Sequence, residues 1–524
     1  MDVVPERLPP PALPLDLCQW LRGRFLHLDF TTGGVRALLG DEAHSALSRG
    51  EPEAPTRATR GAGELGTLVR LFLLGGTEPE SDVEGALGKV DRYVAAGLLS
   101  RADDGLRAAL DLRPYGEGGD ANELADADWY VLSDLDTPAS RQDRDHVTGV
   151  GGASLTLAAS MVRRPVLGTL DLGTGCGVQT LHASRFSTVL VATDVADRAL
   201  AMARSTFALS DVHTAELLKG PWLEPVSDRE FDNIVSNPPF VPGPPRVDYV
   251  YRDSGRAGDE AIAALLADLP GRLMPGGVAQ LLGSWLHVLG EDWPDRVAGW
   301  IPRGCDAWIL QREVTDPAMH VGVWQRDAGL DLSSPDARAQ AAAWLDWMEG
   351  ERVEGVGFGF LLLRKRKDGR EGTVVVEDLP GDHGGLGEEM TGWLDRVDWL
   401  QEHTSDEALL GTRLNLAPTA VLEQYSVPAS GDDRGWADAG SAVVRADGPR
   451  WRHEVDAPAA ALLAGCRGEL PLEELLTLLS FAHDRPIDEL VRATLPAVRE
   501  FVRHGVLLPV DGWAPVPRWR GQRS

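Results

Sequence analysis

The stretch Phe231-Asp-Asn-Ile-Val-Ser-Asn-Pro-Pro-Phe-Val241 is an apolar run that leads into Asn237-Pro238-Pro239-Phe240. Upstream, Val166-Leu-Gly-Thr-Leu-Asp-Leu-Gly-Thr-Gly-Cys-Gly177 is a second β-type run, which opens into glycines at 173, 175 and 177. Glycine tolerates positive φ and lets a ligand approach the backbone closely. A helix that starts there points its free N–H groups at the ligand. The two stretches therefore predict a cofactor site beside a catalytic loop.

The glycine spacing separates this turn from a dinucleotide fingerprint. A Gly-x-Gly-x-x-Gly motif would need glycine at position 178, which is valine. The pattern predicts a helix over 178–186 and a strand over 187–193 that ends at Asp194. In doubly wound sheets an acidic residue at the end of the second strand receives a ribose diol.

The glycine turn, the acid and Asn-Pro-Pro-Phe, in this order, resemble the class I S-adenosylmethionine-dependent methyltransferases over about residues 120–370. More narrowly, they resemble the Asn-Pro-Pro-Phe/Tyr branch that methylates planar nitrogens, which includes release-factor glutamine, adenine N6 and guanine N2 methyltransferases. The resemblance implies an α/β fold with a Rossmann-like seven-stranded sheet and S-adenosyl-L-methionine as cofactor. It also implies a set of cofactor-binding residues: Gly149, Asp171, Gly173, Thr174, Gly175, Gly177, Asp194, Val195 and Asn237.

The same resemblance assigns catalysis to Asn237, Pro238 and Phe240. An amide or exocyclic amine nitrogen is a poor nucleophile, because its lone pair is delocalised. If the Asn237 side-chain oxygen and the Pro238 carbonyl each accept an N–H, the nitrogen is held toward the methyl group and its developing charge is stabilised. Phe240 would stack on a flat acceptor or, alternatively, fill the core.

Each motif also has an ordinary structural explanation when taken alone. The glycines could form a simple tight turn, Asp194 could cap a helix over 196–209, and Asn-Pro-Pro-Phe could end a strand. One departure from the family concerns the third strand, where Lys219-Gly220 stand in place of an acid that contacts adenine. Leu218 or Trp222 could replace that contact by apolar packing.

Composition limits the partners and the location. The 524 residues carry a formal charge of −29, which disfavours a broad electrostatic grip on nucleic acid. The four cysteines (Cys18, Cys176, Cys305 and Cys466) are scattered without a Cys-x-x-Cys, so we expect no metal site and no disulfide framework. No signal peptide or membrane-spanning run is expected, and the predicted location is cytoplasmic.

Length and pattern predict three domains. Residues 1–120 read as a helical, winged-helix-like domain, 121–370 as the methyltransferase domain, and 371–524 as an α+β domain that ends in a second winged-helix-like unit. A hairpin is expected around Asp103-Asp104-Gly105, and helices over 470–481 and 490–504. The loop 146–154, which contains Gly149, is placed to close over the methionine end of the cofactor.

The acceptor stays open between several classes. A protein side-chain amide of the glutamine type ranks first, because the chain is acidic and its flanking domains suit a bulky acceptor. An RNA or DNA base nitrogen and a small metabolite are the enzymatic alternatives. A non-catalytic scaffold that responds to the cofactor is the alternative from another class.

Overall fold

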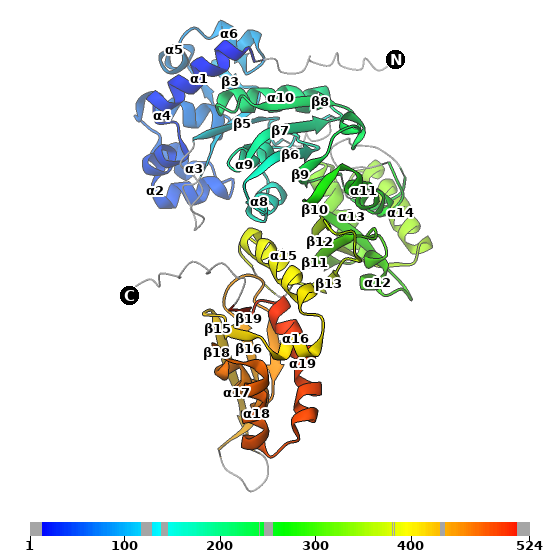
Figure 1. The fold of residues 1–524 in the computed structure, drawn as a ribbon. Helices are drawn as coiled ribbons and strands as arrows, with labels where there is room; N and C mark the ends of the chain where they lie inside the picture. Colours follow the sequence, from blue (N-terminus) through cyan, green and yellow to red (C-terminus); the bar gives the residue numbers. More distant parts are fainter. Residues whose placement is uncertain are drawn as a thin grey trace. The chain divides into compact units, whose positions relative to one another are not determined.

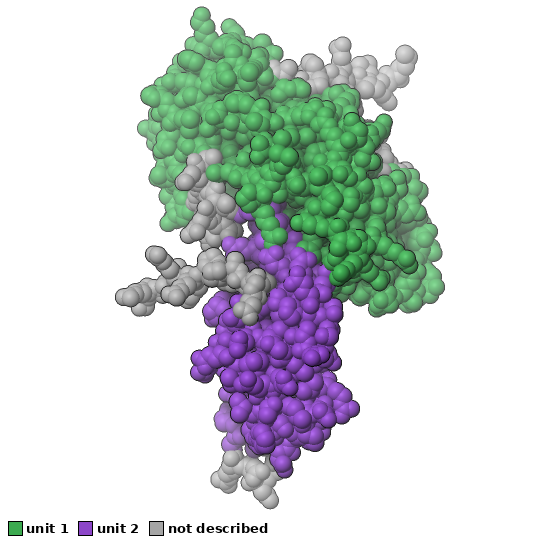
Figure 2. Space-filling model, in the orientation of Figure 1, with its two compact units in different colours: residues 1–158, 164–378 green, residues 159–163, 379–524 purple. Residues whose placement is uncertain are grey.

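The computed structural model describes residues 13–116, 128–137, 145–239, 241–245, 255–379, 381, 383–429 and 435–510. Phe240, to which a stacking role is assigned above, lies outside these residues. The chain divides into two compact units, residues 1–158 with 164–378 and residues 159–163 with 379–524 (Figure 2).

An eight-stranded sheet organises the first unit. Its strand order is β13-β11-β12-β10-β9-β6-β7-β8. Strands β8, β7, β6, β9 and β10 run parallel to one another, whereas β12 runs antiparallel to both β10 and β11. The bounds are β6 Val166–Leu172, β7 Ser187–Asp194, β8 Ala215–Lys219, β9 Phe231–Ser236, β10 Leu273–Val288, β11 Cys305–Thr315, β12 Val353–Lys365 and β13 Val374–Asp378.

This order confirms the predicted Rossmann-like class. If β6 to β12 are counted as the first to seventh strands in chain order, the sheet runs 3-2-1-4-5-7-6, which begins with the 3-2-1-4-5 order of doubly wound folds. The seventh strand inserts antiparallel between the fifth and the sixth. Strand β13, which follows residue 370, pairs with β11 and adds one strand to the predicted seven.

Helices cover both faces of this sheet. On one face, α9 (Val178–Ala183) and α10 (Asp197–Leu209) share a core with the N-terminal helices. On the other face, α11 (Glu260–Asp268) and α12 (Trp293–Ala298) pack over β6, β9 and β10. Figure 1 shows α10 lying along β7 and β8.

The N-terminal segment joins the first of these cores. Phe25 on α1 packs on Tyr130 of β5 with ring centroids 5.1 Å apart. The predicted hairpin is present, since β2 and β3 pair across residues 103–104. The elements are α1 Leu15–His27, α2 Thr32–Ser48, α3 Glu53–Ala58, α4 Gly63–Leu68, the π-helix Val69–Leu73, β1 Thr77–Glu78, α5 Glu80–Leu87, α6 Asp91–Ala95, β2 Leu99–Ala102, β3 Gly105–Ala108, β4 Asp111–Tyr115, β5 Trp129–Ser133 and α8 Gly152–Ala159.

Two helices are inserted between β11 and β12. They are α13 (Pro317–Asp327) and α14 (Pro335–Gly350), each capped at its N-terminus by a side chain, from Asp316 and Ser334 respectively. Their apolar faces form a core with β10 and β12 that includes Trp324 and Trp344. The two indole rings lie 4.5 Å apart.

The second unit is an α+β body with its own core. It contains one three-stranded sheet of order β18-β14-β19 and another of order β15-β16-β17. Both predicted C-terminal helices are present, as α18 and α19. The elements are α15 Gly387–Glu402, α16 Asp406–Leu410, β14 Arg413–Leu416, β15 Ala420–Pro428, β16 Trp436–Arg445, β17 Arg452–Val455, α17 Ala457–Gly465, β18 Arg467–Pro471, α18 Leu472–His483, α19 Ile487–Arg503 and β19 Leu507–Pro509.

Within the described ranges, no helix has both the length and the apolar character needed to cross a membrane. The three-domain division at residues 120 and 370 and the two winged-helix assignments stay predictions.

Candidate active site

The sheet register brings the predicted motifs together. Leu172, the last residue of β6, pairs with Thr193 on β7 and with Ser236 on β9. Gly173, Asp194 and Asn237 are therefore the next residues on three adjacent parallel strands, at one edge of the sheet. The strand order reverses at β6, and this switch point is where open α/β sheets bind ligands.

The three glycines of the turn all need positive φ. Their φ values are 74° at Gly173, 54° at Gly175 and 93° at Gly177, a region that side chains with a Cβ disfavour. The turn is anchored to β7, because the Gly173 and Thr174 N–H groups both donate to the Thr193 carbonyl, at 2.9 and 2.8 Å.

The three glycines have different surroundings, which indicate different roles. A Cβ at Gly173 or Gly175 would meet no atom within 4 Å, so open space lies over this part of the turn. A Cβ at Gly177 would come within 2.6 Å of the Phe207 ring on α10. Gly173 and Gly175 therefore leave room for a ligand, whereas Gly177 allows the helices to pack closely.

Asp194 lies directly beside the turn. Its Oδ2 accepts the Gly175 N–H at 3.0 Å, and its Oδ1 accepts the Ala196 N–H at 2.9 Å. Burial raises the pKa of Asp194, and these backbone bonds counteract part of that rise. The residue does not cap α10, whose N-cap is Ala196. A carboxylate accepts about four hydrogen bonds, so Asp194 retains capacity for hydroxyl donors.

Asp171 supports the turn from below. Its Oδ2 accepts hydrogen bonds from the Thr174 hydroxyl at 2.7 Å and from the Thr180 hydroxyl and N–H at 2.7 and 3.0 Å. Burial raises the pKa of Asp171 to about 6, against the lowering effect of the threonine bonds. The structure thus places Asp171 behind the glycine turn, where it connects β6 to the start of α9.

Asn237 presents an unsatisfied acceptor at the end of β9. Its Oδ1 is buried and has no hydrogen-bond partner among the residues that the structure describes. Buried polar atoms are nearly always paired, so an orphaned oxygen at a strand end indicates a place for an external donor. Pro238 follows and is buried. The Ser236 hydroxyl donates to the Leu172 carbonyl at 2.7 Å and thereby ties this strand end to the glycine strand.

Val195 and Gly149 flank this edge in different ways. Val195 is 47% exposed although it is an aliphatic residue next to Asp194, so it offers an apolar surface there. A Cβ at Gly149 would lie 2.7 Å from the Ser133 hydroxyl. Close packing on β5 is thus a sufficient reason for this glycine. Its loop is held by Asp134, whose Oδ2 accepts the Val147 N–H at 2.8 Å.

The third strand end differs from the family pattern, as the sequence indicates. Lys219 forms an exposed ion pair with Asp197, with Nζ and Oδ2 2.6 Å apart. Leu218 and Trp222 are partly buried and pack against the core beside β6 and β9. Both apolar side chains named above as substitutes therefore contact this core.

The inserted helices brace the chain that follows Pro239, a role that the sequence did not reveal. His320 on α13 contacts the Pro242 carbonyl through Nε2 at 3.0 Å. A Cβ at Gly243 would come within 2.4 Å of the Trp344 ring, so the loop backbone lies directly on α14. The only local signal for this contact is Gly243 between two prolines, and the partner lies a hundred residues downstream.

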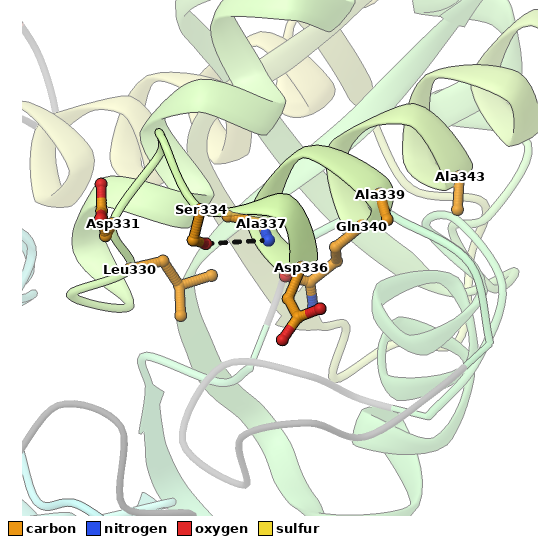
Figure 3. Close-up of a pocket in the computed structure, with 8 residues that line it drawn as sticks. All are labelled: Leu330, Asp331, Ser334, Asp336, Ala337, Ala339, Gln340 and Ala343. Carbon is orange, nitrogen blue, oxygen red and sulfur yellow. Dashed lines mark hydrogen bonds between the residues drawn. The ribbon is translucent and has the colours of Figure 1, made fainter.

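A surface depression also lies along α14 (Figure 3). The Ser334 hydroxyl there accepts the Ala337 N–H at 3.2 Å, which is an N-cap. None of the predicted site residues lines it. Its lining consists of Leu330, Asp331, Ser334, Asp336, Ala337, Ala339, Gln340 and Ala343.

The part of the chain that forms this site matches a known protein family. Residues 148–253, which hold the glycine turn, Asp194 and Asn-Pro-Pro-Phe, match the family described as "Methyltransferase small domain". Residues 148–253 form a methyltransferase domain. The resemblance to methyltransferases that the sequence showed is therefore confirmed. Residues 27–109 and 391–509 match two families described only as domains of unknown function.

Curated relatives cover the same part of the chain. The release factor glutamine methyltransferase of Aliivibrio fischeri is 34% identical over 128 residues, which are 23% of this chain and 44% of the relative. The ribosomal protein L11 methyltransferase of Lactobacillus gasseri is 31% identical over 102 residues, which are 18% of this chain and 32% of the relative. The chain thus spans less than half the length of these relatives.

Among solved structures, the ribosomal protein L11 methylase of Lactobacillus delbrueckii subsp. bulgaricus has 26% sequence identity and a TM-score of 0.19, over 25% of this chain and 57% of that one.

Proposed function

We propose that the protein is an S-adenosylmethionine-dependent methyltransferase that modifies a planar nitrogen, and that this nitrogen is a protein side-chain amide. The observation that carries the proposal is the buried Oδ1 of Asn237, which has no hydrogen-bond partner among the described residues and lies one strand away from the glycine turn and two from Asp194. An acceptor oxygen without a donor suits a substrate that brings its own N–H.

The residues at the edge fit the cofactor. Open space over Gly173 and Gly175 admits its methionine part, and Asp194 retains lone pairs for the ribose hydroxyls. Val195 offers the adenine an apolar contact. Gly149 and Asn237 complete the proposed cofactor set, together with Asp171, Thr174 and Gly177, which shape the turn from within. S-adenosylmethionine supplies an electrophilic methyl group on a sulfonium centre.

Asn237 and Pro238 bind the acceptor nitrogen in this proposal. The Asn237 Oδ1 and the Pro238 carbonyl each accept one N–H of the acceptor nitrogen, which turns its lone pair away from the adjacent π system. As the nitrogen becomes tetrahedral and positive, both oxygens stabilise it. Pro238 and Pro239 restrict the backbone, so the two acceptors keep their separation. Phe240 is proposed to stack on the acceptor.

A protein acceptor is supported by charge and by the relatives. The formal charge of −29 opposes a long polyanion unless a basic groove compensates for it. The matched relatives are named for a release factor and for ribosomal protein L11, which are both proteins. We propose that the reaction takes place in the cytoplasm, where such acceptors are made.

The acceptor class is tested with radiolabelled cofactor. The protein is incubated with labelled S-adenosylmethionine and a lysate from a strain that lacks it, and the products are digested with protease and nuclease in parallel. We expect label that protease releases and nuclease does not. Label released only by nuclease would make the acceptor a base nitrogen. Label confined to the small-molecule fraction would make it a metabolite.

Catalysis is tested by Asn237→Ala. Turnover should fall by about 10² or more, by analogy with the loss of one oxyanion-hole donor. Cofactor affinity by calorimetry should barely change, because Asn237 is proposed to act mainly on the acceptor. Binding of cofactor with no turnover on any fraction of the lysate would instead support a non-catalytic scaffold.

A further inference from the structure

Two histidines and a glutamate meet in the second unit, and none of the three is among the residues assigned to methyl transfer. His453 lies on β17, Glu500 on α19, and His504 directly follows that helix. One ligand atom from each residue can be chosen so that all three lie within 4.8 Å of one another. The Nδ1 of His504 is 3.1 Å from the Nε2 of His453, and the Oε1 of Glu500 is 3.6 Å from the Nδ1 of His453.

The backbone keeps these three side chains close to one another. Glu500 and His504 are four residues apart, so they lie on the same face of the helical turn. The His504 N–H donates to the Glu500 carbonyl at 2.8 Å, which keeps that turn closed. The antiparallel pair of β16 and β17 fixes His453 opposite Val443.

Neighbouring rings hold both imidazoles in place. The Trp451 indole stacks on His504 with centroids 4.4 Å apart and an interplanar angle of 17°. The Phe501 ring meets His453 edge-on, at 5.1 Å and 89°. Ligands whose orientation is fixed by packing lose little rotational freedom when an ion binds.

We propose that His453, Glu500 and His504 bind a divalent transition-metal ion of the zinc type. In a tetrahedral zinc site with Zn–N bonds of 2.0–2.1 Å, two nitrogen ligands are about 3.4 Å apart. The observed separation of 3.1 Å is close to that value. Imidazole and carboxylate together favour zinc over magnesium or calcium, which prefer oxygen ligands alone.

The charges around the cluster are compatible with a cation. The nearby Arg445 donates to the His504 carbonyl at 2.9 Å, but its guanidinium is paired with Glu389 at 2.7 Å and with Asp447 at 3.0 Å. The Glu500 side chain is 51% exposed, so the ion has a path from solvent and room for a water as fourth ligand. Such an ion would connect β17 to the end of α19.

The sequence alone does not predict this cluster. A search for metal sites by cysteine spacing finds none, because these ligands are imidazoles and a carboxylate. Glu500 and His504 alone are an unremarkable helical pair, and His453 comes from a distant strand. Without an ion, the same 3.1 Å contact fits one imidazole that donates to the other. Metal titration decides between these two states.

The test uses the full chain after treatment with a chelator. Zinc chloride is titrated by calorimetry, and bound metal is counted by mass spectrometry after gel filtration. His453→Ala and Glu500→Gln remove single ligands that are not fully buried. His483→Ala is the matched control, because His483 is an exposed histidine at the end of α18 in the same unit.

We expect one zinc ion per chain in the wild type and in His483→Ala. His453→Ala and Glu500→Gln should bind zinc at least about tenfold more weakly. Zinc should raise the melting temperature of the wild type and of the control, but not that of His453→Ala, because an ion that binds only the folded state stabilises it. Equal zinc binding by the wild type and by a correctly folded His453→Ala would overturn the proposal, whatever the outcome for methyl transfer.

Discussion

Alanine at two nearby glycines of the turn should have different effects, mainly on stability at Gly177 and mainly on cofactor affinity at Gly175. Gly175 and Gly177 both have positive φ, so alanine at either position costs about 1–2 kcal/mol of backbone strain. At Gly175 the new methyl group enters open space. At Gly177 it meets the Phe207 ring at 2.6 Å, and overpacking of this kind adds about 1–3 kcal/mol. Gly177→Ala should therefore lose about 2–5 kcal/mol of unfolding free energy, and Gly175→Ala only about 1–2 kcal/mol.

The functional effect should be the reverse. The methyl group of Gly175→Ala occupies the space proposed for the cofactor, so this variant should remain folded and lose S-adenosylmethionine affinity. Urea denaturation measures the first effect and calorimetry the second. Phe207→Leu removes the edge of the ring, so in a double-mutant cycle it should recover part of the stability lost in Gly177→Ala and none of the affinity lost in Gly175→Ala. Unchanged cofactor affinity in Gly175→Ala would refute the proposed role of the open space, and equal destabilisation of both variants would refute the packing argument.

Three further changes probe the rest of the chain. Glu389→Gln should lower the unfolding free energy by about 3–5 kcal/mol in urea, because it removes the carboxylate that pairs with the buried Arg396 and one of the two that pair with the buried Arg445, whereas the exposed Glu474→Gln should change it by less than about 0.5 kcal/mol. The folded-state pKa of Asp171 is raised to about 6, so its stabilising contribution should be present below about pH 4 and lost as pH rises to about 6. The unfolding free energy of the wild type relative to Asp171→Asn should therefore fall over this range. A difference that does not change with pH would contradict the raised pKa. His320→Ala removes the contact with the loop carbonyl at residue 242, so turnover should fall while cofactor affinity stays constant; a loss of affinity instead would place His320 on the cofactor side.

The arrangement of the residues proposed to bind the cofactor was predictable, because the sequence signals for it are local. The glycine turn, the strand before it and the acid that ends the next strand lie within thirty residues of each other. The spacing of that short segment predicts which backbone groups meet, and β6, β7 and α10 follow the predicted pattern closely. The choice of residues also has a local cause, because only glycine adopts the φ of 93° at position 177 without strain.

The surroundings of the catalytic loop were not predictable, because they depend on distant parts of the chain. Nothing near Asn-Pro-Pro-Phe indicates that an indole from residue 344 lies under the backbone of Gly243. Asp171 illustrates a different limit. The family resemblance implied a cofactor contact for Asp171, but its Oδ2 accepts hydrogen bonds from Thr174 and Thr180, which hold the turn in shape. A side chain of this motif can therefore hold the turn without facing the ligand, and its hydrogen bonds distinguish these two roles.

The arrangement of the sheet separates the residues proposed to bind the cofactor from those proposed to bind the acceptor. Everything proposed for the cofactor, apart from Asn237, comes from residues 149–195, on the side of β6 where β7 lies. The acceptor loop follows β9 on the opposite side of β6, and its far end rests on helices inserted between β11 and β12. The two halves are joined by the pairing of β6 with β9, and the Ser236 hydroxyl adds a bond to the Leu172 carbonyl at the end of these strands. Changes in the inserted helices can therefore reshape the acceptor loop while the glycine turn, anchored separately to Thr193, keeps its conformation. Under the proposed assignment, the determinants of acceptor choice lie in α13, α14 and the loop that they support, apart from the fold that holds the cofactor.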